Sequence, residues 1–171
     1  MSARYRDVTA EITVAAVIER DGQFLLVEEI VRDRRVLNQP AGHVEPGESL
    51  LEAVARETLE ESAWRFHPTH LIGTYLWTTP ETGATTIRFG FTGSVSEHFL
   101  ERPLDRGILG THWLSAWQLA AAAQRMRSPM VLRCIEDFVA GKRYPLEVVA
   151  DLRPAPTLMA RPQPVAKSLT G

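Results

Sequence analysis

The sequence predicts a single α/β domain in which helices cover the faces of a mixed β-sheet. Apolar runs of strand length occur in two pairs, a long amphipathic segment lies between the pairs, and two further helical segments follow them. This order of elements is typical of a layered α/β fold. With 171 residues, 44% of them hydrophobic, the chain is long and apolar enough for one buried core.

The first strand pair is predicted over residues 12–19 and 24–29. Both runs are apolar, and Asp21-Gly22 between them is typical of a hairpin turn. The arginine-rich stretch over residues 32–35 is expected to be a loop that leads into the next segment.

The amphipathic segment is predicted to be a helix that begins at Leu50. Ser49 and Glu52 have the spacing of a capping box, in which each side chain accepts a hydrogen bond from the other residue's backbone N–H. Five residues then recur at helical spacing and should form the buried face: Leu51, Val54, Ala55, Thr58 and Leu59.

The second strand pair is predicted over residues 71–79 and 85–93, with a turn at 80–83. A polar loop over 97–109 and a short strand over 111–114 should follow. Ser115 is expected to cap a helix through Ala123, and Pro129 to open a last helix that Gly141 closes. The domain is expected to span residues 1–152, with a loose start over 1–8. Residues 153–171, which are rich in proline, are predicted to be a flexible tail.

Composition excludes several classes of protein. A net charge of −2 without a basic stripe argues against nucleic-acid binding. The single cysteine, Cys134, excludes an intramolecular disulfide and a cysteine-based metal site, and its apolar neighbours favour a core position. The apolar run over 12–18 is too short to span a membrane, and no signal peptide is recognisable. We therefore expect a cytoplasmic protein without membrane or nucleic-acid partners.

Three carboxylates, Glu57, Glu60 and Glu61, fall one turn apart on the predicted helix. Like charges at this spacing destabilise a helix by about 0.2–0.5 kcal/mol per pair. Arg56 interrupts the run and is expected to point away from it. A solvated acidic face is one interpretation. The other is a site for a hard cation, for which oxygen ligands suit Mg²⁺ or Mn²⁺.

The spacing of this segment resembles a known motif. Gly42, five residues, Glu48, seven residues and then Arg56-Glu57-x-x-Glu60-Glu61 resemble the Nudix box, the signature of the Nudix hydrolase family. The resemblance implies an α/β/α sandwich with a mixed sheet. Two positions depart from the motif: Thr58 stands where an apolar residue is usual, and Ala63 replaces a glycine that ends the helix. We therefore expect the helix to continue toward Phe66.

Residues outside the box extend the resemblance to the bacterial NudJ-type phosphatase subgroup, over roughly residues 9–152. Two stretches carry this likeness, Arg127-Ser128-Pro129 and residues 141–147. The resemblance implies hydrolysis of nucleoside tri- and diphosphates with release of phosphate, and action on hydroxymethylpyrimidine pyrophosphate. It leaves open a different Nudix substrate, such as ADP-ribose, and a non-catalytic nucleotide sensor.

The resemblance also implies roles for residues of the box. The metal ligands would be Glu57, Glu60, Glu61 and the backbone carbonyl of Ala41. Glu57 would be either a ligand or the general base. Glu48 and Arg56 would pair with each other and hold the loop and the carboxylates in place.

A late acidic residue often completes the site in this family. Glu97, Glu101 and Asp105 are the candidates, and spacing does not choose among them. We favour Asp105 because it precedes the next predicted strand.

Candidate substrate-binding residues lie on both sides of the box. Arg34 and Arg35 would bind phosphate oxygens, Gln39 and Arg88 would be polar contacts, and Trp77 would stack on a base. The alternatives are solvated arginines and core packing of the aromatic ring. The expected ligand is a small nucleotide or pyrophosphate, and the protein could be a monomer or a homodimer.

Overall fold

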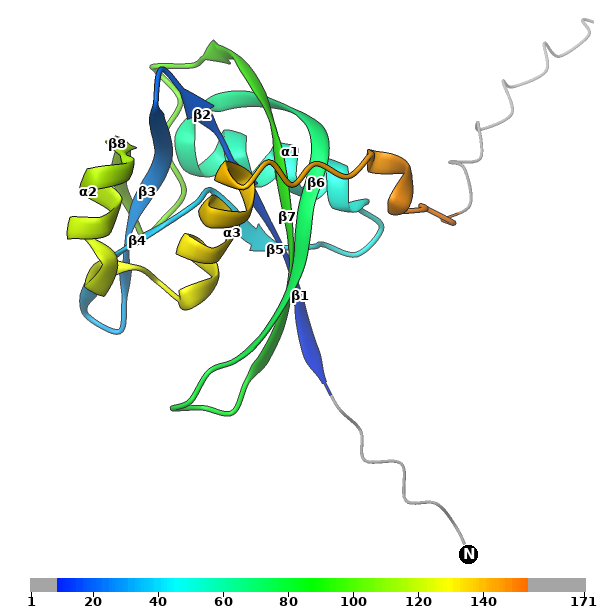
Figure 1. Ribbon diagram of the computed structural model, residues 1–171, viewed down its shortest axis with the longest axis horizontal. Helices are drawn as coiled ribbons and strands as arrows, with labels where there is room; N and C mark the ends of the chain where they lie inside the picture. Colours follow the sequence, from blue (N-terminus) through cyan, green and yellow to red (C-terminus); the bar gives the residue numbers. More distant parts are fainter. Residues whose placement is uncertain (1–8, 154–171) are drawn as a thin grey trace, which may run out of the picture.

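The computed structural model describes residues 9–153 (Figure 1). The predicted loose start at 1–8 and all but the first residue of the predicted tail at 153–171 lie outside this range. The elements of the described part are, in order, β1 Ala10–Val17, β2 Glu19–Arg20, β3 Gln23–Val31, β4 Arg34–Asn38, β5 Ala41–His43, α1 Leu50–Ser62, β6 Trp64–Thr78, β7 Thr85–His98, β8 Ile108–Ser115, α2 Ala116–Ala121, η1 Ala123–Arg125, α3 Pro129–Val139 and η2 Leu146–Val148.

The strands form a mixed sheet and a second, antiparallel sheet. The mixed sheet has the order β5-β1-β7-β6, in which β1 and β7 are parallel and the other pairs are antiparallel. In the second sheet β3 pairs with β2, β4 and β8. The predicted α/β class with a mixed sheet is confirmed. The separate second sheet was not predicted.

Helices α1 and α3 cover opposite faces of the mixed sheet, so that the core has two parts (Figure 1). Val14 and Ala16 of β1 pack on the α1 side with Val54, whereas Val17 packs on the α3 side with Cys134. Successive strand residues point to opposite faces, which explains this division. Cys134 is fully buried, as predicted for a core residue.

The arginine-rich stretch is not a loop, and that prediction was wrong. Arg34 and Arg35 begin β4, which pairs antiparallel with β3. The two turn residues, Arg32 and Asp33, have φ angles of 49° and 62°. Positive φ at both central residues is the geometry of a two-residue hairpin turn, usually marked by Asn-Gly or Asp-Gly. The turn was missed because neither dipeptide is present.

The end of α1 also differs from the prediction. The helix stops at Ser62 and does not continue to Phe66, because Ala63 adopts the left-handed conformation with φ 57° and ψ 16°. The Ala63 N–H donates to Leu59 O, and Ala63 O accepts from Phe99 N. Trp64 can then start β6 and stack on the His98 ring, with centroids 4.2 Å apart. Tertiary contacts therefore stabilise a backbone conformation that is unfavourable for alanine.

The other predicted elements are present with different lengths, whereas β5 and η2 were not predicted. The capping boxes at Ser49 and Ser115 are both formed, and Pro129 lies at the first turn of α3. Strands β6 and β7 are longer than predicted, which shortens the polar loop before β8. Within residues 9–153, the structure contains no helix with the length and apolar character needed to cross a membrane.

We predict that Ala63→Gly raises the free energy of unfolding by about 0.5 kcal/mol. Glycine removes the left-handed strain of about 1–2 kcal/mol, offset by its larger entropy in the unfolded chain. The control is Ala55→Gly inside α1, where φ is helical and the change should destabilise by about 1 kcal/mol. Urea denaturation measures both. Equal destabilisation by the two substitutions would contradict the prediction.

Candidate active site

The acidic residues of α1 face the loop that carries β5. The backbone N–H of Ala41 donates to Glu61 Oε2 at 2.8 Å. Gly42 lies directly against the Glu57 carboxylate, and a Cβ at this position would overlap it. The glycine of the motif is therefore required by the close approach of the Glu57 side chain.

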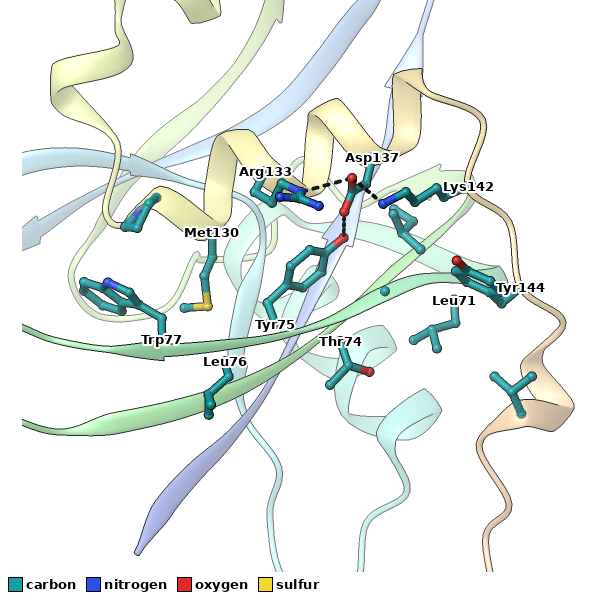
Figure 2. A pocket seen from close by; sticks show the side chains of 14 residues that line it. Leu71, Thr74, Tyr75, Leu76, Trp77, Met130, Arg133, Asp137, Lys142 and Tyr144 are labelled. Carbon is teal, nitrogen blue, oxygen red and sulfur yellow. Dashed lines mark hydrogen bonds and ion pairs between the residues drawn. The ribbon is translucent and has the colours of Figure 1, made fainter. Parts of the chain in front are cut away.

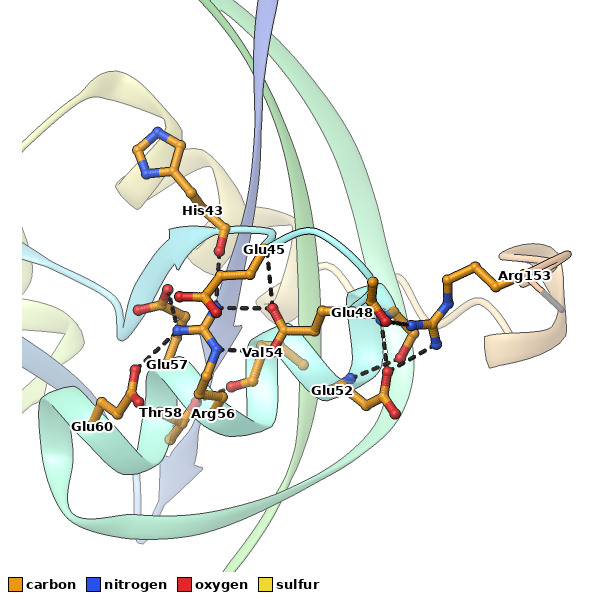
Figure 3. Close-up of polar contacts among 12 residues, drawn as sticks. His43, Glu45, Glu48, Glu52, Val54, Arg56, Glu57, Thr58, Glu60 and Arg153 are labelled. Atoms are coloured by element: carbon orange, nitrogen blue, oxygen red, sulfur yellow. Dashed lines mark hydrogen bonds and ion pairs between the residues drawn. The ribbon is translucent and has the colours of Figure 1, made fainter. Parts of the chain in front are cut away.

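Arg56 connects this loop to the helix (Figure 3). Its Nε and Nη2 donate to the two carboxylate oxygens of Glu48 at 2.8 and 2.9 Å. Nη2 also donates to His43 O at 3.0 Å, and Nη1 donates to Glu57 and Glu60, at 2.9 Å each. The expectation that Arg56 points away from the carboxylates was wrong. Its side chain curls back because Glu48, on the preceding loop, offers a bidentate partner.

The pairing between Glu48 and Arg56 is electrostatically strong. The hydrogen bonds from Arg56 lower the pKa of the Glu48 carboxyl. Glu48 Oε2 also accepts from Glu45 N at 3.1 Å, which braces the turn before the helix. The imidazole of His43 is exposed and, within residues 9–153, pairs with Glu11, whereas the His43 carbonyl accepts from Arg56.

Burial opposes ionisation of the two inner carboxylates. Glu57 is only 9% exposed, and this burial raises its pKa, as do the nearby charges of Glu60 and Asp105. Burial raises the pKa of Glu61 to about 8, and the charges of Glu57, Glu29 and Asp105 act in the same direction. The site thus concentrates more carboxylate charge than Arg56 can compensate.

The structure separates the three late acidic candidates. The Asp105 N–H donates to Glu60 O at 3.0 Å, and the Asp105 charge acts on Glu57 and Glu61. Glu97 instead pairs with Arg65 at 3.0 Å and is exposed. Glu101 is also exposed, in the turn that follows β7. Asp105 is exposed as well, so exposure does not choose among the three. Within residues 9–153, the backbone bond to Glu60 and the charge that acts on Glu57 and Glu61 favour Asp105.

Two polar residues near the carboxylates were missed at the sequence level. Glu29 of β3 lies close enough to raise the pKa of Glu61, and its Oε1 accepts from Asn38 Nδ2 at 3.3 Å. The signal was present in the strand itself, where an apolar run ends in two adjacent glutamates. Charged residues at the end of an otherwise buried strand often mark a site.

The donor chemistry fits a hard divalent cation, although the side chains do not converge on one point. Over residues 9–153, no three Asp, Glu, His or Cys side chains are grouped tightly enough to hold a metal ion together. Arg56 Nη1 lies between Glu57 and Glu60 and takes the place of a shared cation. The oxygen-only donor set matches the preference of Mg²⁺ for carboxylate and carbonyl ligands.

Arg88 is a buried cation with few hydrogen-bond partners. It is 6% exposed, and its Nη1 reaches Asn38 Oδ1 and Gln39 Oε1 only at 3.4 Å each. Its Nε has no hydrogen-bond partner in the described part of the chain, and burial lowers the pKa of the guanidinium. Gln39 Nε2 donates to Val131 O at 2.7 Å. Arg88 and Gln39 are therefore brought together, as expected for residues of one site.

The other predicted substrate-binding residues lie elsewhere. Arg34 and Arg35 are exposed at the start of β4, and Arg34 is about 13 Å along the strand from Asn38. Trp77 lines a cavity between β6 and α3, together with Tyr75. The structure therefore does not bring Arg34, Arg35 or Trp77 to the carboxylates.

We predict that Glu61→Gln changes how stability depends on pH when EDTA removes divalent metals. The folded chain keeps a proton on Glu61 up to about pH 8, whereas the unfolded chain loses it near the ordinary glutamate pKa of 4.5. The free energy of unfolding should therefore fall as pH rises between these values and level off above them. Glutamine keeps the acceptor for Ala41 N–H and should flatten this fall.

Urea denaturation at pH 5 and pH 8 measures the difference. The exposed loop variant Glu45→Gln is the matched control and should keep the wild-type slope. If the pH dependence of Glu61→Gln parallels that of the wild type, Glu61 does not titrate as described.

Known proteins resemble this chain in sequence. Residues 9–133 match the NUDIX domain family. Phosphatase NudJ of Escherichia coli strain K12 is 38% identical over 140 residues, which cover 82% of this chain and 90% of that protein. Phosphatase NudJ of Shigella flexneri matches equally well.

Solved structures show the same fold. A NUDIX hydrolase from Nitrosomonas europaea is 48% identical, covers 84% of this chain and 97% of its own, and superposes with a TM-score of 0.82. The NUDIX domain of Shewanella oneidensis NrtR, solved with ADP ribose, shares the fold at 18% identity and a TM-score of 0.61, covering 81% of this chain and 94% of its own. The chain therefore belongs to the Nudix family, and it is a hydrolase that acts on phosphorus-containing acid anhydrides.

Proposed function

We propose that this hydrolase cleaves the phosphoanhydride bonds of nucleoside tri- and diphosphates in a Mg²⁺-dependent reaction that releases inorganic phosphate. The observation that carries the proposal is the pair of carboxylates, the buried Glu57 and the half-buried Glu61, held against the backbone of Gly42 and Ala41. Similarity to phosphatase NudJ over 82% of the chain supports release of phosphate. Hydroxymethylpyrimidine pyrophosphate, which carries the same type of bond, is a further candidate substrate.

Glu57, Glu60, Glu61 and the carbonyl of Ala41 are the groups that would hold the metal. A bound Mg²⁺ would neutralise phosphate oxygens and lower the pKa of a bound water. Glu57 serves either as a ligand or as the general base, and its raised pKa suits the second role. Asp105, beside the same carboxylates, is the late acidic residue of the site.

Glu48 and Arg56 position the other groups without contacting the substrate. Arg56 satisfies its donors on Glu48, on His43 O and on the carboxylates of Glu57 and Glu60. This arrangement fixes the rotamers of both glutamates relative to the loop. The reaction needs no covalent nucleophile from the protein.

Arg88 and Gln39 form the polar wall that would contact the nucleotide. A buried guanidinium with an unpaired Nε and two long hydrogen bonds is poorly satisfied by the described part of the protein alone. An acceptor atom of the substrate would complete its hydrogen bonds. The exposed Arg34 and Arg35 would act only by attracting anions from solution.

The decisive experiment is a substrate panel with Mg²⁺. It includes nucleoside tri- and diphosphates, hydroxymethylpyrimidine pyrophosphate and ADP-ribose, and scores phosphate with and without added inorganic pyrophosphatase. Release of phosphate that does not depend on the pyrophosphatase supports the proposal. Release of pyrophosphate alone, or activity confined to ADP-ribose, would refute it.

We predict that Glu60→Gln lowers kcat by about a hundredfold or more, the scale observed when one key electrostatic group is lost. The substitution keeps the side-chain shape and removes a charge from the metal site. Steady-state kinetics at saturating Mg²⁺ measure the loss. Glu45→Gln, in the exposed part of the box loop, should keep wild-type rates. Near-normal turnover by Glu60→Gln would remove Glu60 from the metal ligands.

We predict that Arg88→Met raises KM about tenfold while kcat falls by less. Methionine preserves most of the buried volume, so that the variant loses the guanidinium donors rather than the fold. A rise in KM with little change in kcat indicates lost binding that is equal in ground and transition states. An unchanged KM would exclude contact between Arg88 and the substrate.

A further inference from the structure

The loop between β5 and α1 carries Glu48, the partner of Arg56, but it has little packing of its own. Residues 44–49 include no helix or strand, and residues 45–47 are exposed. A hollow of about 550 Å³ lies between this loop and the first turns of α1. Polar contacts rather than core packing must therefore hold residues 45–48, which we call the box turn, in place.

The chain after α3 leaves the face of the sheet that α3 covers and passes around the edge strand β6 (Figure 1). Tyr144 lies beside Leu71 of β6 (Figure 2), and Leu71 N donates to Tyr144 O at 2.9 Å while Tyr144 N donates to Leu71 O at 2.8 Å. Leu146 and Val149 then pack against the core on the α1 side. Residues 141–153, which we call the strap, therefore reach the side of the sheet that α1 covers.

Arg153, at the end of the strap, contacts the box turn and the first turn of α1 (Figure 3). Its Nη1 donates to Gly47 O, and its Nη2 donates to Glu52 Oε2 at 2.8 Å. Glu52 Oε2 also accepts from Ser49 N at 2.7 Å in the capping box. Asp151 accepts from Arg153 Nε at 2.9 Å and from Nη2 at 2.6 Å. One guanidinium therefore joins the strap to groups that are 101 and 106 positions away in the chain.

The charges around Arg153 favour this arrangement. Hydrogen bonds from Arg153 lower the pKa of Asp151 to about 2, and hydrogen bonds from Ser49 and Arg153 lower the pKa of Glu52. Both carboxylates are therefore ionised at neutral pH. An isolated, exposed ion pair contributes little to the stability of a whole protein. The planar guanidinium of Arg153 binds a carbonyl and a carboxylate at the same time, so that its main effect is on the orientation of the groups it joins.

We propose that Arg153 is a positioning residue, which ties the strap to the box turn and thereby holds Glu48 where Arg56 binds it. The carbonyl that Arg153 binds belongs to Gly47, the residue before Glu48. Glu48 in turn binds Arg56, which contacts two of the α1 carboxylates. The effect on the turn does not depend on the substrate, whereas the effect on turnover rests on the proposed role of the α1 carboxylates.

Hydrogen exchange of the full chain, measured by NMR in EDTA and without substrate, tests whether Arg153 holds the turn. The Glu48 N–H donates to Glu45 O at 3.1 Å, and the Ser49 N–H donates to Glu52, so that both amides are protected while the turn and the cap are formed. Arg153→Gln should speed their exchange about fivefold, because local opening governs exchange in such segments. Amides of β1 should be unaffected. Unchanged exchange at Glu48 and Ser49 would overturn the proposal.

Steady-state kinetics with a substrate that the enzyme cleaves test the positioning role. Arg153→Gln should lower kcat about threefold and leave KM unchanged, because the α1 carboxylates lose their fixed orientation while Arg88 and Gln39 keep theirs. A purely structural role would lower the unfolding temperature without changing kcat, and an unchanged kcat would overturn the proposal. If no anhydride is cleaved, the proposed function fails, and the exchange measurement still decides whether Arg153 holds the turn.

Arg143→Gln is the matched control. Arg143 lies in the same strap and also donates to carbonyl oxygens, those of Phe138 and Lys142, but neither belongs to the box turn. This variant should therefore keep wild-type exchange in the turn and wild-type kcat. Equal effects of Arg143→Gln and Arg153→Gln would assign the changes to general loosening of the strap and overturn the proposal. Thermal unfolding of each variant verifies that the fold is intact.

Discussion

The contact between the Arg56 guanidinium and the Glu48 carboxylate is the constraint on which the candidate active site depends. It joins a loop that has little regular structure of its own to a helix anchored in the core. Because the pair is bidentate and partly buried, it fixes orientation as well as distance. The same guanidinium then reaches Glu57 and Glu60, so that one side chain sets the positions of the loop and of two carboxylates.

Placing Glu57 and Glu61 close together in a partly buried site lowers the stability of the folded chain when both carboxylates are ionised. Burial of Glu57 and Glu61 raises their pKa values, which means that the folded protein resists the ionised form that a metal ion requires. A divalent cation bound there, as we propose, would reverse this balance because it would be the largest local charge. A helix selected for stability alone would not keep these residues together. The arrangement is understandable for a site that gains its stability on binding an ion.

The residues of the Nudix box and the residues along β6 lie at different places on the mixed sheet, whose two edges are β5 and β6. The box residues lie against β5, whereas the cavity residues lie along β6 and α3, with the core between them. The residues that resemble a particular subgroup are found at this second edge.

Much of the fold and part of the site were already determined by the sequence. The capping box at Ser49 and the spacing of Glu57, Glu60 and Glu61 are local features, set by helical periodicity. The buried face of α1 was predicted only in part, because Val54 and Thr58 are buried whereas Leu51, Ala55 and Leu59 are half-buried and Glu57 is buried instead. Their likeness to the Nudix box gave the family.

Only the tertiary structure decided what depends on residues distant in the chain. Ala63 takes a left-handed conformation because Phe99 N donates to Ala63 O and the His98 ring stacks on Trp64, the next residue. The charge of Asp105, but not that of Glu97, acts on the α1 carboxylates. Trp77 lines a cavity between β6 and α3, and Glu29 of the second sheet lies close to Glu61. The physical reason is the same in each case: strand pairing and core packing place these side chains, and no local pattern of residues encodes the resulting distances.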